Sequence, residues 1–269
     1  MDIESTLPQQ RTGVLARTGT GILAMLQVLG EASALFLATL RTLPHVLRDR
    51  QRVIEQLVSI GTDTLPIAAV LSLFVGMVLV LQAADQLREV SQGVLGPIVG
   101  LATTKEFGPV MMAFLLAGRA GSAMAAEIGA MTIYDEVNAL RTMDIDPVRF
   151  LVLPRFVAAT ISLPVLVLYS DFIGVWGGAL VVAADPVVKI SVNEYFARML
   201  EWVHFHDLLV GFAKAIVFGM ISTIVPCAFG LRTRGGTAGI AVSTTAAVVW
   251  SFVLILIFDF LIVRVSLAL

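Results

Sequence analysis

The sequence predicts an all-α protein that crosses a membrane several times, and three observations support this prediction. Hydrophobic residues make up 58% of the chain, charged residues make up only 14%, and the mean hydropathy is +0.91. Several stretches each supply about 20 mostly apolar residues, enough to cross a hydrocarbon layer of about 30 Å. These stretches lack the polar face of a helix on a soluble core. We therefore expect about five transmembrane helices, an N-terminal interfacial helix and a short helix in a cytoplasmic loop.

The N-terminal segment, residues 1–45, is expected to lie on the membrane surface. Residues 22–40 are apolar, but they contain Gln27 and Glu31 and are followed by Arg41. No basic segment precedes a compact apolar core with a small-residue cleavage site, so a signal peptide is not indicated. An amphipathic helix in the cytoplasmic interface fits this pattern. A sixth span is the alternative.

Five spans are expected in the rest of the chain, near residues 62–82, 97–119, 156–183, 206–229 and 243–266. Arginines set their orientation, because basic residues are enriched in cytoplasmic loops. They gather in segments 11–52, 141–155 and 232–234, whereas the opposite loops hold only Arg88, Lys189 and Arg198. This asymmetry places loop 134–155 in the cytoplasm and the C-terminus outside.

Three ionisable residues fall inside predicted spans at one depth: Glu106, Lys214 and Asp259. Each lies seven to nine residues from the outer end of its span, which is roughly 10–14 Å at 1.5 Å per residue. Because an unpaired charge in a bilayer costs several kcal/mol, we expect the three to form a buried cluster. The cluster has two interpretations: a gate whose packing changes during transport, or a static ion pair that holds helices together.

Small residues in the second span are spaced for close helix packing. Gly118 with Ser122, and Ala117 with Gly121, fit the small-xxx-small pattern. This spacing is also common inside monomeric bundles, so it gives only weak support for contact between two copies.

Several classes of function have no support. The sequence lacks a Walker A motif, so ATP would have to be hydrolysed by another chain. A single cysteine, Cys227, excludes an internal disulfide and a cysteine-based metal cluster. His204, His206 and Asp207 lie close together, but no third ligand of suitable spacing follows, and an interfacial loop is the favoured interpretation. We expect no catalytic residue, no metal and no cofactor in this chain, and no binding of nucleic acid.

A set of motifs in order gives the chain a family resemblance. They are Glu106-Phe-Gly-Pro, the run LAGRAGSA from Leu116, AEIGAM from Ala126, Asp146-Pro-Val-Arg, Pro154-Arg-Phe, GVWGG from Gly174, GIAVSTTAAVV from Gly239, and Asp259-Phe. Together they resemble the MlaE/YrbE family, the permease subunits of MCE-associated lipid ABC transporters. The likeness covers roughly residues 45–269, and it implies one permease domain over residues 46–269.

The resemblance implies a homodimer of permeases in a bacterial inner membrane, two cytoplasmic ATPase subunits that bind ATP and Mg²⁺, and a periplasmic MCE-domain partner. It also implies a phospholipid pocket at the dimer centre. Residues 132–143 would be the coupling helix that docks on the ATPase. The residues of this segment that would act in coupling are Thr132, Asp135, Glu136, Leu140 and Arg141. Without the resemblance, this segment is an ordinary amphipathic loop helix.

The first span carries the candidate lipid-binding residues. Phe74, Met77, Val78 and Leu81 form one helical stripe at spacings of three and four, and Gln82 lies near the outer mouth. The resemblance implies that the outer half of the first span lines the lipid cavity. The alternative is that the stripe faces bilayer lipid or packs against a neighbouring helix, because a protein core and a lipid tail require the same apolar surface.

The function expected is therefore the permease subunit of an ATP-driven phospholipid transporter. Its main rival is a proton-coupled secondary transporter of a hydrophobic substrate, in which Glu106, Lys214 and Asp259 would relay protons. An intramembrane enzyme or a scaffold is a third possibility, but the sequence shows no plausible nucleophile and base pair.

Overall fold

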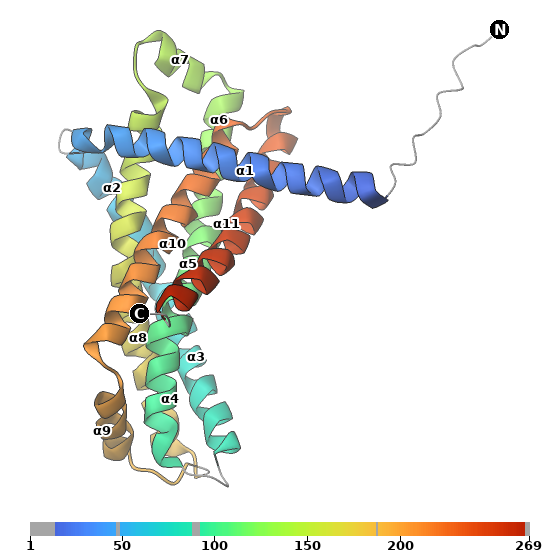
Figure 1. The fold of residues 1–269 in the computed structure, drawn as a ribbon. Coiled ribbons are helices and arrows are strands. Elements are labelled where there is room, and N and C mark those ends of the chain that lie inside the picture. Colours follow the sequence, from blue (N-terminus) through green and yellow to red (C-terminus); the bar gives the residue numbers. More distant parts are fainter. Residues whose placement is uncertain (1–13, 47–48, 88–91, 187, 267–269) are drawn as a thin grey trace.

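The computed structural model of the protein describes residues 14–46, 49–87, 92–186 and 188–266, which form a bundle of helices (Figure 1). The described residues contain no strand, so the prediction of an all-α fold is confirmed. Three residues used to predict the orientation, Arg11, Arg48 and Arg88, lie outside the described residues.

Within the part of the chain that the structure describes, five helical stretches are long and apolar enough to cross a membrane. They are Arg50–Gln86, Leu95–Ile133, Val148–Ala184, Phe205–Leu231 and Gly236–Ser266. Each contains one predicted span, so the prediction of five membrane helices is confirmed. The second stretch extends well beyond the predicted end at residue 119, because its Gly- and Ala-rich continuation remains helical to Ile133.

Three of these stretches are built from several helical segments. The first consists of α2 (Arg50–Gly61), a short 3-10 turn and α3 (Leu65–Gln86). The second consists of α4 (Leu95–Ala102), the π-helical segment η4 (Thr103–Phe107), α5 (Gly108–Leu116), a second π-helical segment η5 (Ala117–Gly121) and α6 (Ser122–Ile133). The third begins with π-helical η6 (Val148–Val152) and continues as α8 (Leu153–Ala184). The last two are α10 (Phe205–Leu231) and α11 (Gly236–Ser266).

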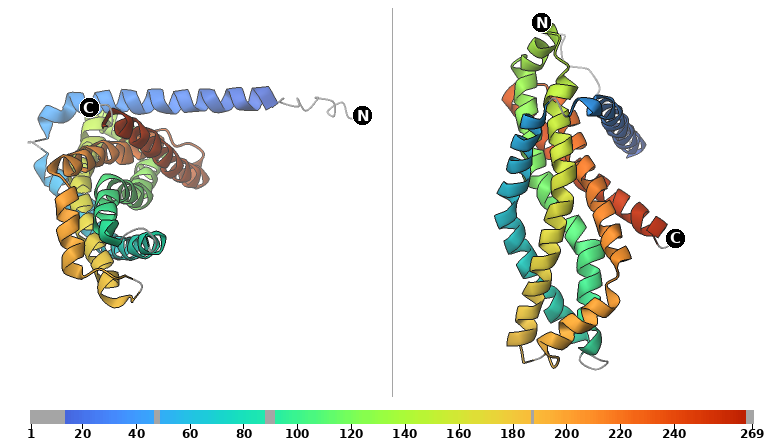
Figure 2. Two further views of the ribbon diagram at one scale, coloured as in Figure 1. Left: turned by 60° about the horizontal axis from the view of Figure 1, so that its bottom comes forward. Right: turned by 90° about the vertical axis from the view of Figure 1, so that its left-hand side faces the viewer.

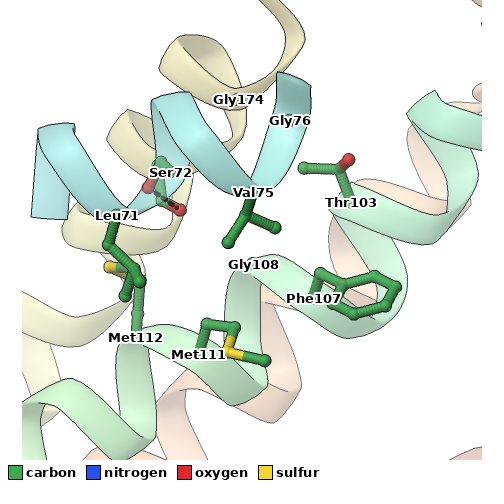
Figure 3. Close-up of a pocket in the computed structure, with 11 residues that line it drawn as sticks. Leu71, Ser72, Val75, Gly76, Thr103, Phe107, Gly108, Met111, Met112 and Gly174 are labelled. Carbon is green, nitrogen blue, oxygen red and sulfur yellow. Dashed lines mark hydrogen bonds between the residues drawn. The ribbon is translucent and has the colours of Figure 1, made fainter. Parts of the chain in front are cut away.

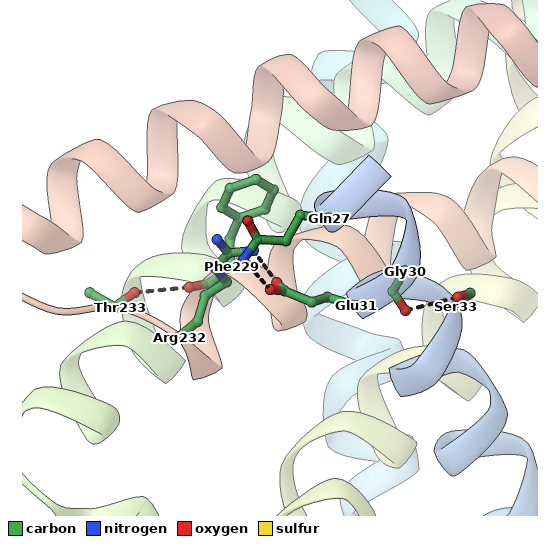
Figure 4. Close-up of polar contacts among 7 residues, drawn as sticks. All are labelled: Gln27, Gly30, Glu31, Ser33, Phe229, Arg232 and Thr233. Atoms are coloured by element: carbon green, nitrogen blue, oxygen red, sulfur yellow. Dashed lines mark hydrogen bonds and ion pairs between the residues drawn. The ribbon is translucent and has the colours of Figure 1, made fainter. Parts of the chain in front are cut away.

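The first helix, α1 (Val14–Thr42), lies across one end of the bundle and extends beyond it (Figures 1 and 2). Val28 and Ala32 on its inner face are buried in a cluster that α10 and α11 share. On its polar side Glu31 forms an ion pair with Arg232, which follows α10, and accepts a hydrogen bond of 3.0 Å from Gln27 (Figure 4). Helix α1 is not among the five candidate spans, and its position in the membrane interface stays a prediction.

Helix α8 lies at the centre of the bundle. In the most apolar 18-residue stretch of its span 72% is buried, whereas in that of α11 only 22% is buried. Its contact with α3 is close because two glycines meet there. A Cβ added at Gly76 would overlap the backbone of Gly174, so only a glycine fits at this crossing. One turn away, the hydroxyls of Ser72 and Ser170 lie 2.7 Å apart and link the same two helices.

Short helices mark the two ends of the bundle (Figure 1). At one end α7 (Glu136–Thr142) joins α6 to η6, close to α1. At the other end α9 (Val192–Trp202) packs on α4 and buries Tyr195 completely. We call these the α7 end and the α9 end.

Candidate functional site

The three intramembrane charges predicted to cluster meet at one point. Lys214 on α10 is completely buried, and its Nζ lies 2.7 Å from Oε2 of Glu106 and 2.8 Å from Oδ1 of Asp259. Lys214 donates a hydrogen bond to Glu106, whereas the contact with Asp259 is an ion pair without hydrogen-bond geometry. Three elements far apart in sequence, η4, α10 and α11, therefore converge on one ammonium group.

The buried Lys214 lies between carboxylates that come from two other elements. A buried ammonium is strongly disfavoured unless it is paired, and here two carboxylates surround one cation. The Asp259 side chain is 18% exposed and the Glu106 side chain is 44% exposed. The cluster is therefore buried at Lys214 and open to the surface of the chain at Glu106. It contains two carboxylates for one ammonium group.

The π-helical segment η4 aims two neighbouring charges at the same helix. Glu106 reaches Lys214, and Lys105 forms a 2.8 Å ion pair with Asp207, two turns away on α10. The backbones also approach closely there, since a Cβ added at Gly211 would overlap the carbonyl oxygen of Thr104. π-helical turns inside α-helices occur frequently at functional sites. The segment is thus held to α10 by two ion pairs.

Asp207 has a structural role at the start of α10. Its Oδ2 accepts a 2.9 Å hydrogen bond from the backbone N–H of His204, which caps the start of α10. Among the described residues, no group of three His, Cys, Asp or Glu side chains is arranged to hold a metal ion.

A small cavity lies where α3, η4 and α8 cross, beside the Ser72 and Ser170 hydroxyl pair (Figure 3). It has room for about one water molecule, and Val75 and Phe107 are among the residues that line it. Asp171 is buried nearby on α8, and its Oδ1 has no hydrogen-bond partner.

The candidate lipid stripe on α3 faces outward in the single chain. Phe74, Val78 and Leu81 are 60%, 46% and 43% exposed, and Gln82 is exposed beside them. Met77 differs, because it packs partly against the cluster around Val80, Leu95 and Tyr195. Four of the five predicted residues therefore share one apolar surface, which is available to lipid or to another protein surface.

The segment predicted as a coupling helix has different bounds and two faces. The helix α7 begins at Glu136, whereas Thr132 belongs to α6 and donates hydrogen bonds to the carbonyl oxygens of Ile128 and Gly230. Asp135 precedes α7 with a left-handed backbone, φ 60°. Glu136 and Arg141 are exposed.

The inner face of α7 anchors it to the bundle. Val137 and Leu140 are buried against Leu151, and partly buried Met131, Ile145, Phe150 and Leu231 surround them. Leu140 is therefore an anchor and cannot belong to an outward docking face. The charged residues of the segment remain free to contact a partner from outside.

The three residues predicted to pack helices, Gly118, Gly121 and Ser122, differ in how closely another helix approaches them. A Cβ added at Gly121 would come within 3.0 Å of Pro226 on α10, whereas one added at Gly118 would meet only Phe252 at 4.0 Å. Ser122 donates a hydrogen bond to the carbonyl oxygen of Gly118 within its own helix. Gly121 is thus a helix contact inside this chain, and Gly118 is not tightly packed.

The structure also contains a set of arginine contacts at the α7 end that the sequence analysis does not identify. Arg119 donates hydrogen bonds to the carbonyl oxygens of Ser59 and Ile60 and to Thr64. Three further pairs are Arg149 with Asp49 at 3.0 Å, Arg155 with Glu127 at 2.8 Å, and Arg52 over the ring of Phe150 at 3.7 Å. The only sequence signal for them is the concentration of arginine at this end, which is used above for orientation.

Comparison with known proteins agrees with this architecture. The sequence profile of the family described as Permease MlaE matches residues 53–265. A Rickettsia typhi protein named a probable ABC transporter permease is 39% identical over 213 residues, 78% of this chain and 81% of that protein. The Haemophilus influenzae protein named intermembrane phospholipid transport system permease protein MlaE is 34% identical over 253 residues, 93% of this chain and 96% of that protein. The Arabidopsis thaliana chloroplastic protein TRIGALACTOSYLDIACYLGLYCEROL 1 is 34% identical over 211 residues, 78% of this chain and 60% of that protein. This chain, a multi-pass membrane protein, therefore belongs to the MlaE permease family.

Proposed function

We propose that this chain is the membrane permease of an ATP-driven phospholipid transporter in a bacterial inner membrane. The observation that carries the proposal is the similarity, over 93% of the chain, to a protein named as a permease of intermembrane phospholipid transport. ATP and Mg²⁺ bind a separate ATPase chain, because this sequence contains no Walker A motif. The permease itself carries out no covalent chemistry.

The α7 end faces the cytoplasm in this proposal, and the C-terminus is periplasmic. This orientation places Arg149, Arg155 and Arg232 on the cytoplasmic side, as the positive-inside rule requires. It also points the exposed charges of α7, Glu136 and Arg141, toward a cytoplasmic ATPase dimer. Because Val137 and Leu140 anchor α7 to the bundle, a push on α7 would move the adjoining spans as a rigid body.

The remaining partners are a second copy of this chain, a periplasmic MCE-domain protein and phospholipid. The apolar stripe of Phe74, Val78 and Leu81 lies in the periplasmic half of α3 in this orientation and would line the lipid path between two copies. The Glu106, Lys214 and Asp259 cluster lies at a similar depth. It would act as a gate, because its ion pairs must stretch or exchange if η4, α10 and α11 move relative to one another.

Reconstitution tests this function against its main rival. The chain, purified together with its ATPase, is placed in liposomes that contain a fluorescent phospholipid, with an MCE-domain acceptor outside. We expect lipid release that requires ATP and stops when the ATPase is inactivated. Lipid movement that follows a pH gradient and ignores ATP would overturn the proposal and favour proton-coupled transport.

A further inference from the structure

A polar cavity at the α7 end carries a second inference. It has a volume of about 240 Å³ and lies between α2, α6, η6 and the start of α8. Its charged and polar lining residues are Arg52, Glu55, Gln56, Glu127 and Arg155, and its apolar ones are Met131, Phe150, Leu151 and Pro154. The cavity is therefore lined by both charged and apolar side chains.

Arg155 is the lining residue whose hydrogen-bonding capacity is not satisfied within the chain. Its side chain is only 5% exposed, and its Nη2 lies 2.8 Å from Oε2 of Glu127. Its Nη1 is buried and has no hydrogen-bond partner. A guanidinium group carries five N–H donors and no acceptor, and a buried donor that is left unpaired destabilises the protein. An acceptor beside Nη1, such as a phosphate oxygen, would remove this destabilisation.

The charges around the cavity also restrict what binds there. Two arginines, Arg52 and Arg155, are matched by two carboxylates, Glu55 and Glu127. A purely anionic ligand would be repelled by both carboxylates. A zwitterion could pair its negative group with the arginines and its positive group with the carboxylates. Arg52 is already positioned, because its guanidinium carbon lies 3.7 Å above the Phe150 ring.

The position of the cavity points to a lipid. Helix α1 lies across the bundle at the α7 end, as an interfacial helix does (Figure 1), and α2 begins shortly after it at Arg50. Arg52 and Glu55 follow within the first six residues of α2, which is about 8 Å along the helix. The cavity thus lies near the level of the headgroups in that leaflet.

We propose that this cavity binds the headgroup of a phospholipid that joins its phosphate to a primary ammonium, as phosphatidylethanolamine does. The phosphate oxygens accept hydrogen bonds from Arg155 and Arg52, and the ammonium donates to Glu127 and Glu55. Lys214 lies 17 residues from the end of α10 at Leu231, about 25 Å along the helix, so this site is separate from the charge cluster. The proposal goes beyond the transport function, since binding here requires neither ATP nor a partner.

Native mass spectrometry of the detergent-purified chain tests the proposal. Phosphatidylethanolamine, phosphatidylcholine and phosphatidylglycerol are titrated in turn, and bound lipids are counted. We expect the first to bind most tightly, because a quaternary ammonium cannot donate hydrogen bonds and a glycerol headgroup carries no positive charge. Equal affinity for all three lipids would overturn the proposal.

Two variants locate the binding. Glu55→Gln, at an exposed position that the fold does not depend on, should weaken phosphatidylethanolamine binding roughly fivefold, the upper range for an exposed ion pair. Arg155→Lys keeps the charge but loses the forked donors, and it should weaken binding about tenfold. The matched control is Glu194→Gln, the same change at an exposed position on α9, which should have no effect. If Glu55→Gln and Glu194→Gln bind alike, the headgroup does not lie in this cavity.

A third variant separates this site from the transport path. Asp259→Asn alters the charge cluster and should leave the preference for phosphatidylethanolamine unchanged. A loss of that preference in Asp259→Asn, with Glu55→Gln unaffected, would assign the lipid to the cluster and overturn the proposal. Failure of ATP-driven transport in liposomes would leave the binding result standing, so the two proposals fail independently.

Discussion

Lys214 Nζ lies 2.7 Å from Glu106 Oε2, although 108 positions separate the two residues along the chain. The contact joins a π-helical segment to a transmembrane helix, and Asp259 completes the cluster from the last span. An exposed carboxylate bound to a buried ammonium can exchange partners without exposing the lysine to hydrocarbon. The proposed gate depends on this asymmetry between an exposed carboxylate and a buried ammonium.

Charge reversal at the buried position should be more damaging than neutralisation. Lys214→Met leaves two carboxylates without their cation, and we expect a loss of about 3–5 kcal/mol of stability, the usual effect of breaking a buried pair. Lys214→Glu places three carboxylates together and should lower the melting temperature further and abolish transport. Both variants are compared in detergent by thermal unfolding and in liposomes by lipid release. Equal effects would contradict a shared cluster.

Replacing an outward charge on α7 should weaken ATPase binding without disturbing the fold. Glu136→Lys changes an exposed residue in the first turn of α7, so the permease should keep its melting temperature and its oligomeric state. We expect reduced recovery of the ATPase in affinity purification. Glu194→Lys, the same reversal on α9 at the other end, is the control. Unchanged recovery with Glu136→Lys would remove this residue from the docking surface.

The sequence predicts the five spans and the charge cluster for clear physical reasons. A span must be apolar over about 20 residues, and a charge inside it must find a partner, so composition and depth are enough to group Glu106, Lys214 and Asp259. The exclusion of α1 from the spans is predictable because Gln27 and Glu31 interrupt an apolar stretch. These features follow from the thickness and low polarity of the hydrocarbon layer, which impose the same requirements on every membrane-spanning segment.

Other features depend on tertiary packing and have no local signal. The π-helical segment Thr103–Phe107 determines where Lys105 and Glu106 point, but no composition marks a π-helical turn. Arg155 and Glu127 lie on different helices on either side of the α7 loop, and only their packed arrangement shows that one is buried and the other exposed. Similarly, the pattern that predicts α7 cannot show that Leu140 faces inward.

Two glycines offer a matched test of helix packing. Gly76→Ala would push a Cβ into the Gly174 backbone, and overpacking of this kind usually costs 1–3 kcal/mol. Gly118→Ala has space around it and gains helix propensity of up to about 1 kcal/mol. We expect the first variant to unfold at a lower temperature and the second to match or exceed the original chain. The reverse order would contradict the close crossing of α3 and α8.

Gly118 also tests contact between copies, because its surroundings in the single chain are open. A larger residue, Gly118→Leu, should fold normally. If this face meets a second copy, the variant should shift the protein from dimer to monomer in size-exclusion chromatography with light scattering, while Gly118→Ala stays dimeric. A dimer unchanged by both substitutions would place the interface elsewhere.

The phenol of Tyr195 should remain protonated in strongly alkaline solution. Burial at the α9 end raises its pKa well above the ordinary value of 10, and its hydroxyl has no hydrogen-bond partner. Because the folded pKa lies above the unfolded one, the chain is stabilised below pH 10, and this contribution is lost as the pH rises through the folded value. In an absorbance titration at 295 nm, Tyr195→Phe should therefore match the original chain from pH 9 to 11. A smaller absorbance rise in the variant would mean that Tyr195 ionises in this range and is more accessible than the packing of α9 on α4 allows.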